Sequence, residues 1–158
     1  MAASKLLPLV RGTVLYRVYT RRAGEPDRAL SFYRDSHGRA SPVLDASGKK
    51  DPALYAAVDT AQGATLEMLY HTVLKKFRKG AVLPRSIFKD LRLVKIAVKQ
   101  TLKLVSIEAL QAAGDVAPPV FSLPRADYSD TQAVAQALYS RYRTASGLCW
   151  HSAQGPAN

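Results

Sequence analysis

Cysteine is nearly absent from this sequence: Cys149 is the single one among 158 residues. One thiol excludes an internal disulfide and a cysteine-based zinc site. Long apolar runs are also missing, because each run is short and interrupted, so no segment is expected to span a membrane. The apolar patch near the start is broken by Pro8 and followed by Arg11, which makes it a poor secretory signal. We therefore expect a cytoplasmic protein.

Motifs for a bound cofactor, a metal or a serine nucleophile are missing as well. There is no G-x-G-x-x-G, which excludes Rossmann-type use of a dinucleotide. The histidines, His37, His71 and His151, are scattered rather than set at metal-ligand spacing. Ser152 lacks the G-x-S-x-G elbow of a serine hydrolase, and His151 beside it points to the other face of a strand. We therefore expect no metal and no resident cofactor.

Acidic residues are few: 12 Asp and Glu stand against 23 Lys and Arg, which gives a net charge of +11. Such an excess favours a polyanionic partner, and a basic nucleic-acid-binding domain is one hypothesis for this chain. Many of the cations lie between Lys75 and Lys103. They follow a predicted helix end and then alternate along a predicted strand, with only Phe77 and Phe88 available for base stacking. This arrangement is more typical of a solvated or partner-docking face.

The chain is long enough for one domain with its own core, and its hydrophobic content of 47% excludes wholesale disorder. Alternation and short apolar runs predict strands over 13–19, 53–57, 91–99, 101–106 and 148–152. Helical periodicity predicts a helix from Asp59 or Thr60 to about Phe77 and a short one ended by Gly114. A third helix is predicted over 131–143, capped by Asp130, with Val134, Ala137 and Leu138 on one face. Because strict β-α alternation is missing, we expect one domain of the α/β (α+β) class, a mixed sheet with flanking helices.

Arg17 interrupts the strand predicted over 13–19, where it stands between Tyr16 and Val18. An unpaired buried charge is expensive. One interpretation therefore places Arg17 on an edge strand, in water or paired to an acid. The other interpretation makes it an anion site, because a planar guanidinium with several donors holds phosphate or carboxylate oxygens.

Glu67 and Ser152 are the other two polar residues in apolar settings. Glu67 lies one residue after Leu66 and one helical turn before His71. It is either an exposed glutamate in a weak pair with His71 or a carboxylate at the edge of a pocket, where it stabilises positive charge formed in a transition state. Ser152 ends a predicted strand, so it either starts a turn or belongs to a site that opens there. The functional interpretation depends on the joint occurrence of Arg17, Glu67 and Ser152.

Four segments of the sequence resemble, in the same order, the RES domain family, which is named after an arginine, a glutamate and a serine. They are "LYRV" (15–18), "HGRASP" (37–42), "LYAAVDTAQGATLE" (54–67) and "SGLCWHS" (146–152). In addition, "DYSDTQAVAQALY" (127–139) resembles the helix before the serine strand. The resemblance implies an N-terminal extension over 1–12, a RES domain over 13–158 and a fold similar to ADP-ribosyltransferases. Because members usually continue with more strand, we also expect a C-terminal truncation.

The resemblance further implies a toxin of a toxin–antitoxin pair that cleaves the bond between nicotinamide and ribose in NAD. The implied enzyme is an NAD glycohydrolase or phosphorylase, and a protein ADP-ribosyltransferase toxin using the same site is the alternative. The implied partner is a helix-turn-helix antitoxin of the Xre type, so nucleic acid is reached only through that antitoxin. An inactive relative that only binds a partner is a further alternative.

The roles that the resemblance implies fit the chemistry of these residue types. Arg17 and Arg39 hold the pyrophosphate or the nicotinamide ribose, Tyr55 lines the nicotinamide pocket, Glu67 serves the reacting ribose and Ser152 completes the site. The implied catalytic residues are Glu67, Arg17 and Ser152, and NAD is a substrate rather than a cofactor. Nicotinamide is a cationic leaving group that needs no general acid, so one carboxylate facing the ribosyl oxocarbenium ion suffices.

Overall fold

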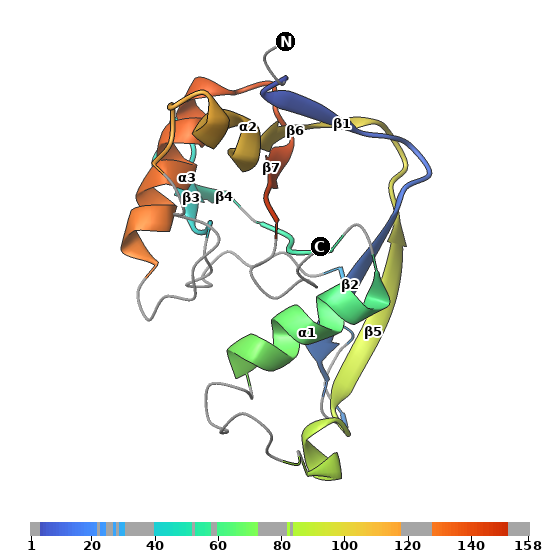
Figure 1. The fold of residues 1–158 in the computed structure, drawn as a ribbon. Helices are drawn as coiled ribbons and strands as arrows, with labels where there is room; N and C mark the ends of the chain where they lie inside the picture. The colour runs from blue at the N-terminus through green and yellow to red at the C-terminus, as the bar shows by residue number, and fades with distance from the viewer. Residues whose placement is uncertain are drawn as a thin grey trace. The chain divides into compact units, whose positions relative to one another are not determined.

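The structure is a computed structural model that describes residues 4–21, 23–24, 27, 29–30, 40–51, 53–57, 60–72, 82, 84–117 and 128–151. Within these ranges the side chains of Glu67, Tyr70, His71, Thr72 and Ile87 are not described. Strands and helices are mixed along the chain, which confirms the predicted α/β (α+β) class (Figure 1). No helix in the described part of the chain is both long and apolar enough to cross a membrane.

The chain divides into two compact units. The first combines Met1–Arg11, Phe32–Leu54 and Lys99–Ala153, and the second combines Gly12–Ser31, Tyr55–Val98 and Gln154–Asn158. Each unit therefore draws on segments that lie far apart in the sequence.

The first unit is built on a three-stranded sheet in the order β1 (Leu6–Leu9), β6 (Leu102–Ser106), β7 (Gly147–Cys149). β1 runs antiparallel to β6, whereas β7 runs parallel to it, with Ser106 opposite Cys149. Pro8 is tolerated in β1 because an edge strand can do without one ladder donor. The parallel pairing brings the ends of β6 and β7 to the same edge of the sheet.

Two helices of the first unit supply most of its apolar core, together with Val105 of β6 and Val116. The helices are α2 (Ile107–Ala112), which directly follows β6, and α3 (Ser129–Arg141). The fully covered side chains include Val105, Ile107 and Leu110, which is 0% exposed. The whole core cluster is Val105, Ile107, Leu110, Val116, Ala135 and Leu138.

A polar edge of α3 holds a small hairpin, β3 (Val43–Leu44) paired antiparallel with β4 (Lys50–Asp51). The Gln136 amide accepts from the Leu44 N–H at 2.6 Å and donates to the Leu44 carbonyl at 3.0 Å. One turn further along the helix, the Tyr139 hydroxyl donates to Asp51 at 2.6 Å. One turn before, the Gln132 amide donates to the carbonyl of the fully buried Ser41 at 2.8 Å. These three side chains stand at i, i+4 and i+7, on one face of the helix.

The second unit pairs β2 (Val14–Thr20) antiparallel with β5 (Leu91–Ala97), and α1 (Ala61–Thr72) packs against β2 (Figure 1). A short 3-10 turn, η2 (Arg85–Ile87), precedes β5. The Thr60 hydroxyl accepts from the Gly63 N–H at 2.9 Å, so Thr60 caps α1. On its other edge, β2 pairs through Tyr16 with an isolated bridge at Ala57. β2 is therefore flanked on both edges.

Several sequence predictions are confirmed and others are wrong. β2, β5 and β6 lie where the alternating patterns place strands, and α2 ends before Gly114, whose φ of 74° suits a glycine. The strand predicted over 53–57 is reduced to isolated bridge residues, and the β3–β4 hairpin is not among the predicted strands. The helix predicted to reach Phe77 is described only as far as Thr72.

The predicted cap of α3 is also wrong. The helix begins at Ser129 after Tyr128, so Asp130 lies inside the first turn, where its charge favours the exposed N–H groups. Ala137 is exposed, and the buried face is formed by Thr131, Ala135 and Leu138. The Thr131 hydroxyl makes burial acceptable because it donates to the Tyr128 carbonyl at 2.9 Å. Periodicity alone does not distinguish a buried threonine from an exposed one.

Ser106 caps α2 at the end of β6 and is 4% exposed. Its hydroxyl accepts from the Ala109 N–H at 3.1 Å. We expect Ser106→Ala to lower the free energy of unfolding by about 1 kcal/mol, because one helical donor then loses its acceptor. Urea titration of the wild type, Ser106→Ala and the cap-retaining Ser106→Thr measures this, and equal midpoints for the alanine variant and the wild type would disprove the cap.

Candidate functional site

Arg17 is buried in β2, with 4% of its surface exposed. It lies opposite Val94 of β5, and its neighbours on the same face of β2 are Leu15 and Tyr19. The interpretation of Arg17 as an arginine in water is therefore wrong. Its Nη1 donates to the Ala29 carbonyl at 3.2 Å. The Arg17 guanidinium is thus buried within the second unit and bonded to a backbone carbonyl.

The segment that supplies the Ala29 carbonyl is organised by Asp27. The Asp27 carboxylate accepts from the Ala29 N–H and from the hydroxyl of the buried Tyr19, both at 2.8 Å. These bonds hold the pKa of Asp27 below its usual value, and the bond from the Ala29 N–H has the larger effect. The bond to Asp27 raises the pKa of Tyr19. Because the Ala29 carbonyl is the acceptor of Arg17, Asp27 fixes the surroundings of the guanidinium indirectly.

The lowered pKa of Asp27 has a consequence for stability. A carboxyl whose folded pKa is depressed stabilises the fold above its unfolded pKa, and this contribution is lost as the pH falls through the folded pKa. We therefore expect the thermal midpoint of the wild type to fall between pH 5 and pH 2 more steeply than that of Asp27→Asn. Tyr19→Phe removes one donor and is expected to flatten the profile partly. Parallel profiles for all three proteins would contradict this account.

Tyr55 and Glu67 belong to the same unit as Arg17. Tyr55 is partly buried and lies two residues before Ala57, whose N–H and carbonyl both bond to Tyr16 of β2, at 2.8 and 2.7 Å. Glu67 lies in α1, the helix that packs against β2. The structure thus brings Arg17, Tyr55 and the helix that carries Glu67 into one compact unit. The contacts of the Glu67 side chain with His71 or with a pocket stay a prediction.

Arg39 and Ser152 lie outside the described residues. The chain next to each of them is held in place in the first unit. Ser41, two residues after Arg39, is fully buried and its carbonyl accepts from Gln132 of α3. His151, which directly precedes Ser152, is bonded to Glu108 of α2. Arg39 therefore stands two residues before a buried backbone position, and Ser152 directly follows a hydrogen-bonded one.

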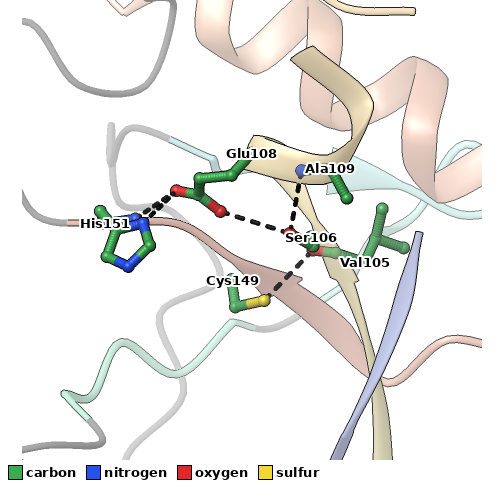
Figure 2. Close-up of polar contacts among 6 residues, drawn as sticks. All are labelled: Val105, Ser106, Glu108, Ala109, Cys149 and His151. Atoms are coloured by element: carbon green, nitrogen blue, oxygen red, sulfur yellow. Dashed lines mark hydrogen bonds and ion pairs between the residues drawn. The ribbon is translucent and has the colours of Figure 1, made fainter. Parts of the chain in front are cut away.

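The cluster around Glu108 was not found from the sequence (Figure 2). Glu108 accepts from the His151 N–H, its Oε1 lies 3.2 Å from His151 Nδ1, and the Ser106 hydroxyl donates to its Oε2 at 3.4 Å. The nearby Cys149 thiol donates to the Val105 carbonyl at 3.6 Å. The one local signal available in the sequence is Ser106, two residues before the acid, and a serine there favours a helix cap rather than a contact with His151.

The chemistry available in the Glu108 cluster is limited. Burial, and then the charge of Glu108, raise the pKa of the Cys149 thiol. A raised pKa leaves less thiolate, so Cys149 is a poor nucleophile. In the described part of the chain, His, Cys, Asp and Glu do not gather in threes as metal ligands require. The cluster thus holds backbone rather than a reacting atom.

A comparison with protein families identifies the chain. The family model of the RES domain matches residues 14–158, which is most of the sequence and includes Arg17, Arg39, Tyr55, Glu67 and Ser152. No curated protein and no solved structure matches the chain significantly. The chain therefore belongs to the RES domain family, and this membership supports a function that acts on NAD.

Proposed function

We propose that this protein is an NAD-consuming enzyme that cleaves the bond between nicotinamide and ribose and passes the ADP-ribosyl group to water or phosphate. One observation carries the proposal most directly. Arg17 is 4% exposed in β2, and the same unit contains Tyr55 and the helix of Glu67, in a chain that belongs to the RES domain family. A guanidinium, an aromatic residue and a carboxylate-bearing helix within one unit are the groups suited to binding a dinucleotide with a cationic ring.

The role proposed for Glu67 follows from the charges in the reaction. The nicotinamide ring of NAD is cationic and leaves as a neutral molecule, so the leaving group needs no proton. Positive charge moves to C1′ and the ring oxygen of the ribose as the bond breaks, as in glycoside hydrolysis. A carboxylate fixed beside that carbon stabilises the transition state more than the ground state, because in the ground state the positive charge is on the nicotinamide ring. A single acid is therefore sufficient.

The remaining site residues are proposed to bind NAD. Arg17 and Arg39 pair with the pyrophosphate or the nicotinamide ribose, because a guanidinium matches two oxygens at once. Tyr55 stacks on the nicotinamide while that ring is cationic. Ser152 completes the site with a hydroxyl that is both donor and acceptor. We further propose a cytoplasmic toxin whose activity is blocked by a helix-turn-helix antitoxin of the Xre type.

The test is to incubate the purified full chain with NAD and to follow nicotinamide and the ribosyl product by chromatography and mass spectrometry. We expect free nicotinamide to appear as NAD disappears. ADP-ribose identifies water as the acceptor and a phosphorylated ADP-ribose identifies phosphate. Transfer of ADP-ribose from NAD to a protein in an added lysate would instead establish the ADP-ribosyltransferase alternative. Intact NAD after incubation under all these conditions would overturn the proposed function.

The net charge of +11 favours one alternative function, nucleic-acid binding, which the same purified protein can be used to test. A basic nucleic-acid-binding domain binds nucleic acid with an affinity that falls steeply with salt, because binding releases counterions. We expect only weak binding of DNA or RNA by the chain at physiological salt. A tight, strongly salt-dependent complex together with intact NAD would favour that alternative instead.

A further inference from the structure

One edge of β5 carries no further strand within the described residues. The sheet of the second unit consists of β2 and β5, so β2 covers one edge of β5 and leaves the other open (Figure 1). β2 differs, because its own second edge is met by Ala57. β5 runs for seven residues without proline or glycine. An uninterrupted edge of this kind is a template for pairing with another chain.

The hydrogen bonds between β2 and β5 show which groups of β5 face the open edge. The Val98 N–H donates to the Thr13 carbonyl at 3.0 Å, and the Asp90 carbonyl accepts from the Arg21 N–H at 2.8 Å. Because successive residues direct their N–H and carbonyl groups to opposite edges, the even-numbered residues from 90 to 98 face β2. The residues with N–H and carbonyl groups directed to the open edge and with exposed side chains are Leu93, Lys95 and Ala97.

The side chains along the open edge combine positive charge with apolar surface. Leu93 is 49% exposed, and Phe88, which shortly precedes the strand, is 39% exposed. Asp90 is the single acid between 84 and 97. The exposed cations of this segment are Arg85, Lys89, Arg92 and Lys95, and none of them forms an ion pair with an acid of the described residues.

Two of these cations already have fixed positions. The Arg92 guanidinium donates to the carbonyls of Lys89 and Leu91 at 2.9 and 2.8 Å, next to the start of the open edge. The Lys95 ammonium lies 5.9 Å from the centre of the Tyr16 ring, on the face of the sheet that Lys95 shares with Leu93. Charge and backbone groups are therefore presented together along one strand.

The charge of the edge decides between the possible occupants. A second copy of this chain would bring another Arg92 and Lys95 against the first pair, and each chain carries a net charge of +11. The phosphates of nucleic acid accept hydrogen bonds but donate none, so they leave the open carbonyls of β5 without donors. An extended polypeptide supplies donors and acceptors in alternation. Acidic side chains three positions apart in it lie beside Arg92 and Lys95 in either strand direction.

We propose that the open edge of β5 binds an extended, acidic segment of a partner protein, which joins the β2–β5 sheet as a third strand. Its acids pair with Arg92 and Lys95, and an apolar or β-branched residue lies beside Leu93. The surface includes none of the residues assigned to NAD. It therefore goes beyond the proposed function, and the two can fail independently.

The first part of the test uses the free protein. By NMR-detected hydrogen exchange we expect the amides of Leu93, Lys95 and Ala97 to exchange roughly tenfold faster, or more, than those of Val94 and Ile96, which are bonded to β2. Slow exchange of the three amides in dilute protein would mean that the edge is already covered. Slow exchange that develops only as the protein concentration rises would assign the edge to a second copy. Either result would overturn the proposal.

The second part adds a blocked six-residue peptide with glutamate at positions two and five and valine or threonine elsewhere. We expect the three open-edge amides to shift and to exchange more slowly as peptide is added, whereas a copy with lysine in place of glutamate should not bind. Two further copies are N-methylated on alternate peptide nitrogens. One should bind and the other should not, because only one edge of an added strand faces β5.

Charge reversal on the protein completes the test. Lys95→Glu is expected to weaken peptide binding about tenfold, since an attractive cross-strand pair becomes a repulsive one. Lys103→Glu makes the same change at an exposed lysine of β6, in the first unit, and should bind the peptide as the wild type does. Nicotinamide release from NAD by Lys95→Glu should equal that of the wild type, whichever way the proposed function is decided.

Three results of the peptide experiments would overturn the proposal. They are unchanged open-edge amides at millimolar glutamate peptide, equal binding of the two N-methylated copies, and equal weakening by Lys95→Glu and Lys103→Glu. Shifts of the same amides by a DNA or RNA oligonucleotide, but not by the peptide, would assign the edge to nucleic acid instead. If Lys95→Glu does not fold, the N-methylated pair decides on the wild-type protein.

Discussion

Replacing Glu67 by glutamine is expected to lower the rate of nicotinamide release from NAD by roughly 10²-fold. The change keeps the size of the side chain and removes its charge, so it removes the interaction that grows as the ribosyl cation forms. A group that acts only in the transition state affects kcat and kcat/KM alike. We therefore expect an unchanged KM. Steady-state assays of the wild type and Glu67→Gln across NAD concentrations measure both constants.

A matched control for Glu67 is available on the same helix. Gln62 is exposed in α1, and Gln62→Ala should leave both the rate and the thermal midpoint near those of the wild type. A Glu67→Gln variant that turns over NAD as fast as the wild type would remove Glu67 from the mechanism. A rise in KM at constant kcat would give it a role in uniform substrate binding instead.

Replacing Arg17 by methionine is expected to lower kcat/KM for NAD by roughly 10- to 100-fold, mainly through KM. This range corresponds to the loss of hydrogen bonds to a charged group. Methionine retains the long flexible side chain that fills the position and removes the charge. Since Arg17 is 4% exposed and stands on β2, its orientation is set by packing, so in the binding mode that we propose it would meet the pyrophosphate as a preorganised donor.

Two further variants separate the binding role of Arg17 from its structural role. Arg17→Lys keeps the charge and loses the planar fork, so it should recover only part of the affinity. Tyr19→Phe disturbs the neighbouring bond to Asp27 without removing a charge, and its KM should stay near the wild-type value. If Arg17→Met folds and binds NAD as the wild type does, then Arg17 serves the fold alone.

The parts of the fold that the sequence predicts well are those with local signals. β2 and β5 follow from period-two alternation. The cap of α1 was predicted at Asp59 or Thr60, before an apolar stripe, and the structure has it at Thr60. α3 was placed correctly but capped wrongly, because Asp130 suits the first turn as well as the cap position. Local chemistry thus identified elements better than their boundaries.

The parts that the sequence did not predict depend on contacts between distant segments. Buried Arg17 is bonded to Ala29 and lies opposite Val94 of β5, and nothing in "LYRV" reveals either contact. The Glu108 cluster joins residues 43 positions apart, and the hold of Gln136 on Leu44 spans 92. A single sequence shows the side chains that can make such contacts, but it does not show which distant residues contact each other.

We propose that one carboxylate, Glu67, promotes cleavage of the nicotinamide–ribose bond. The measurement that tests it most directly is nicotinamide release from NAD by the wild type and by Glu67→Gln, side by side at saturating NAD. We expect release by the wild type that matches the loss of NAD, and a rate lower by roughly 10²-fold in the variant. Equal rates in the two proteins, or intact NAD with both, would contradict it.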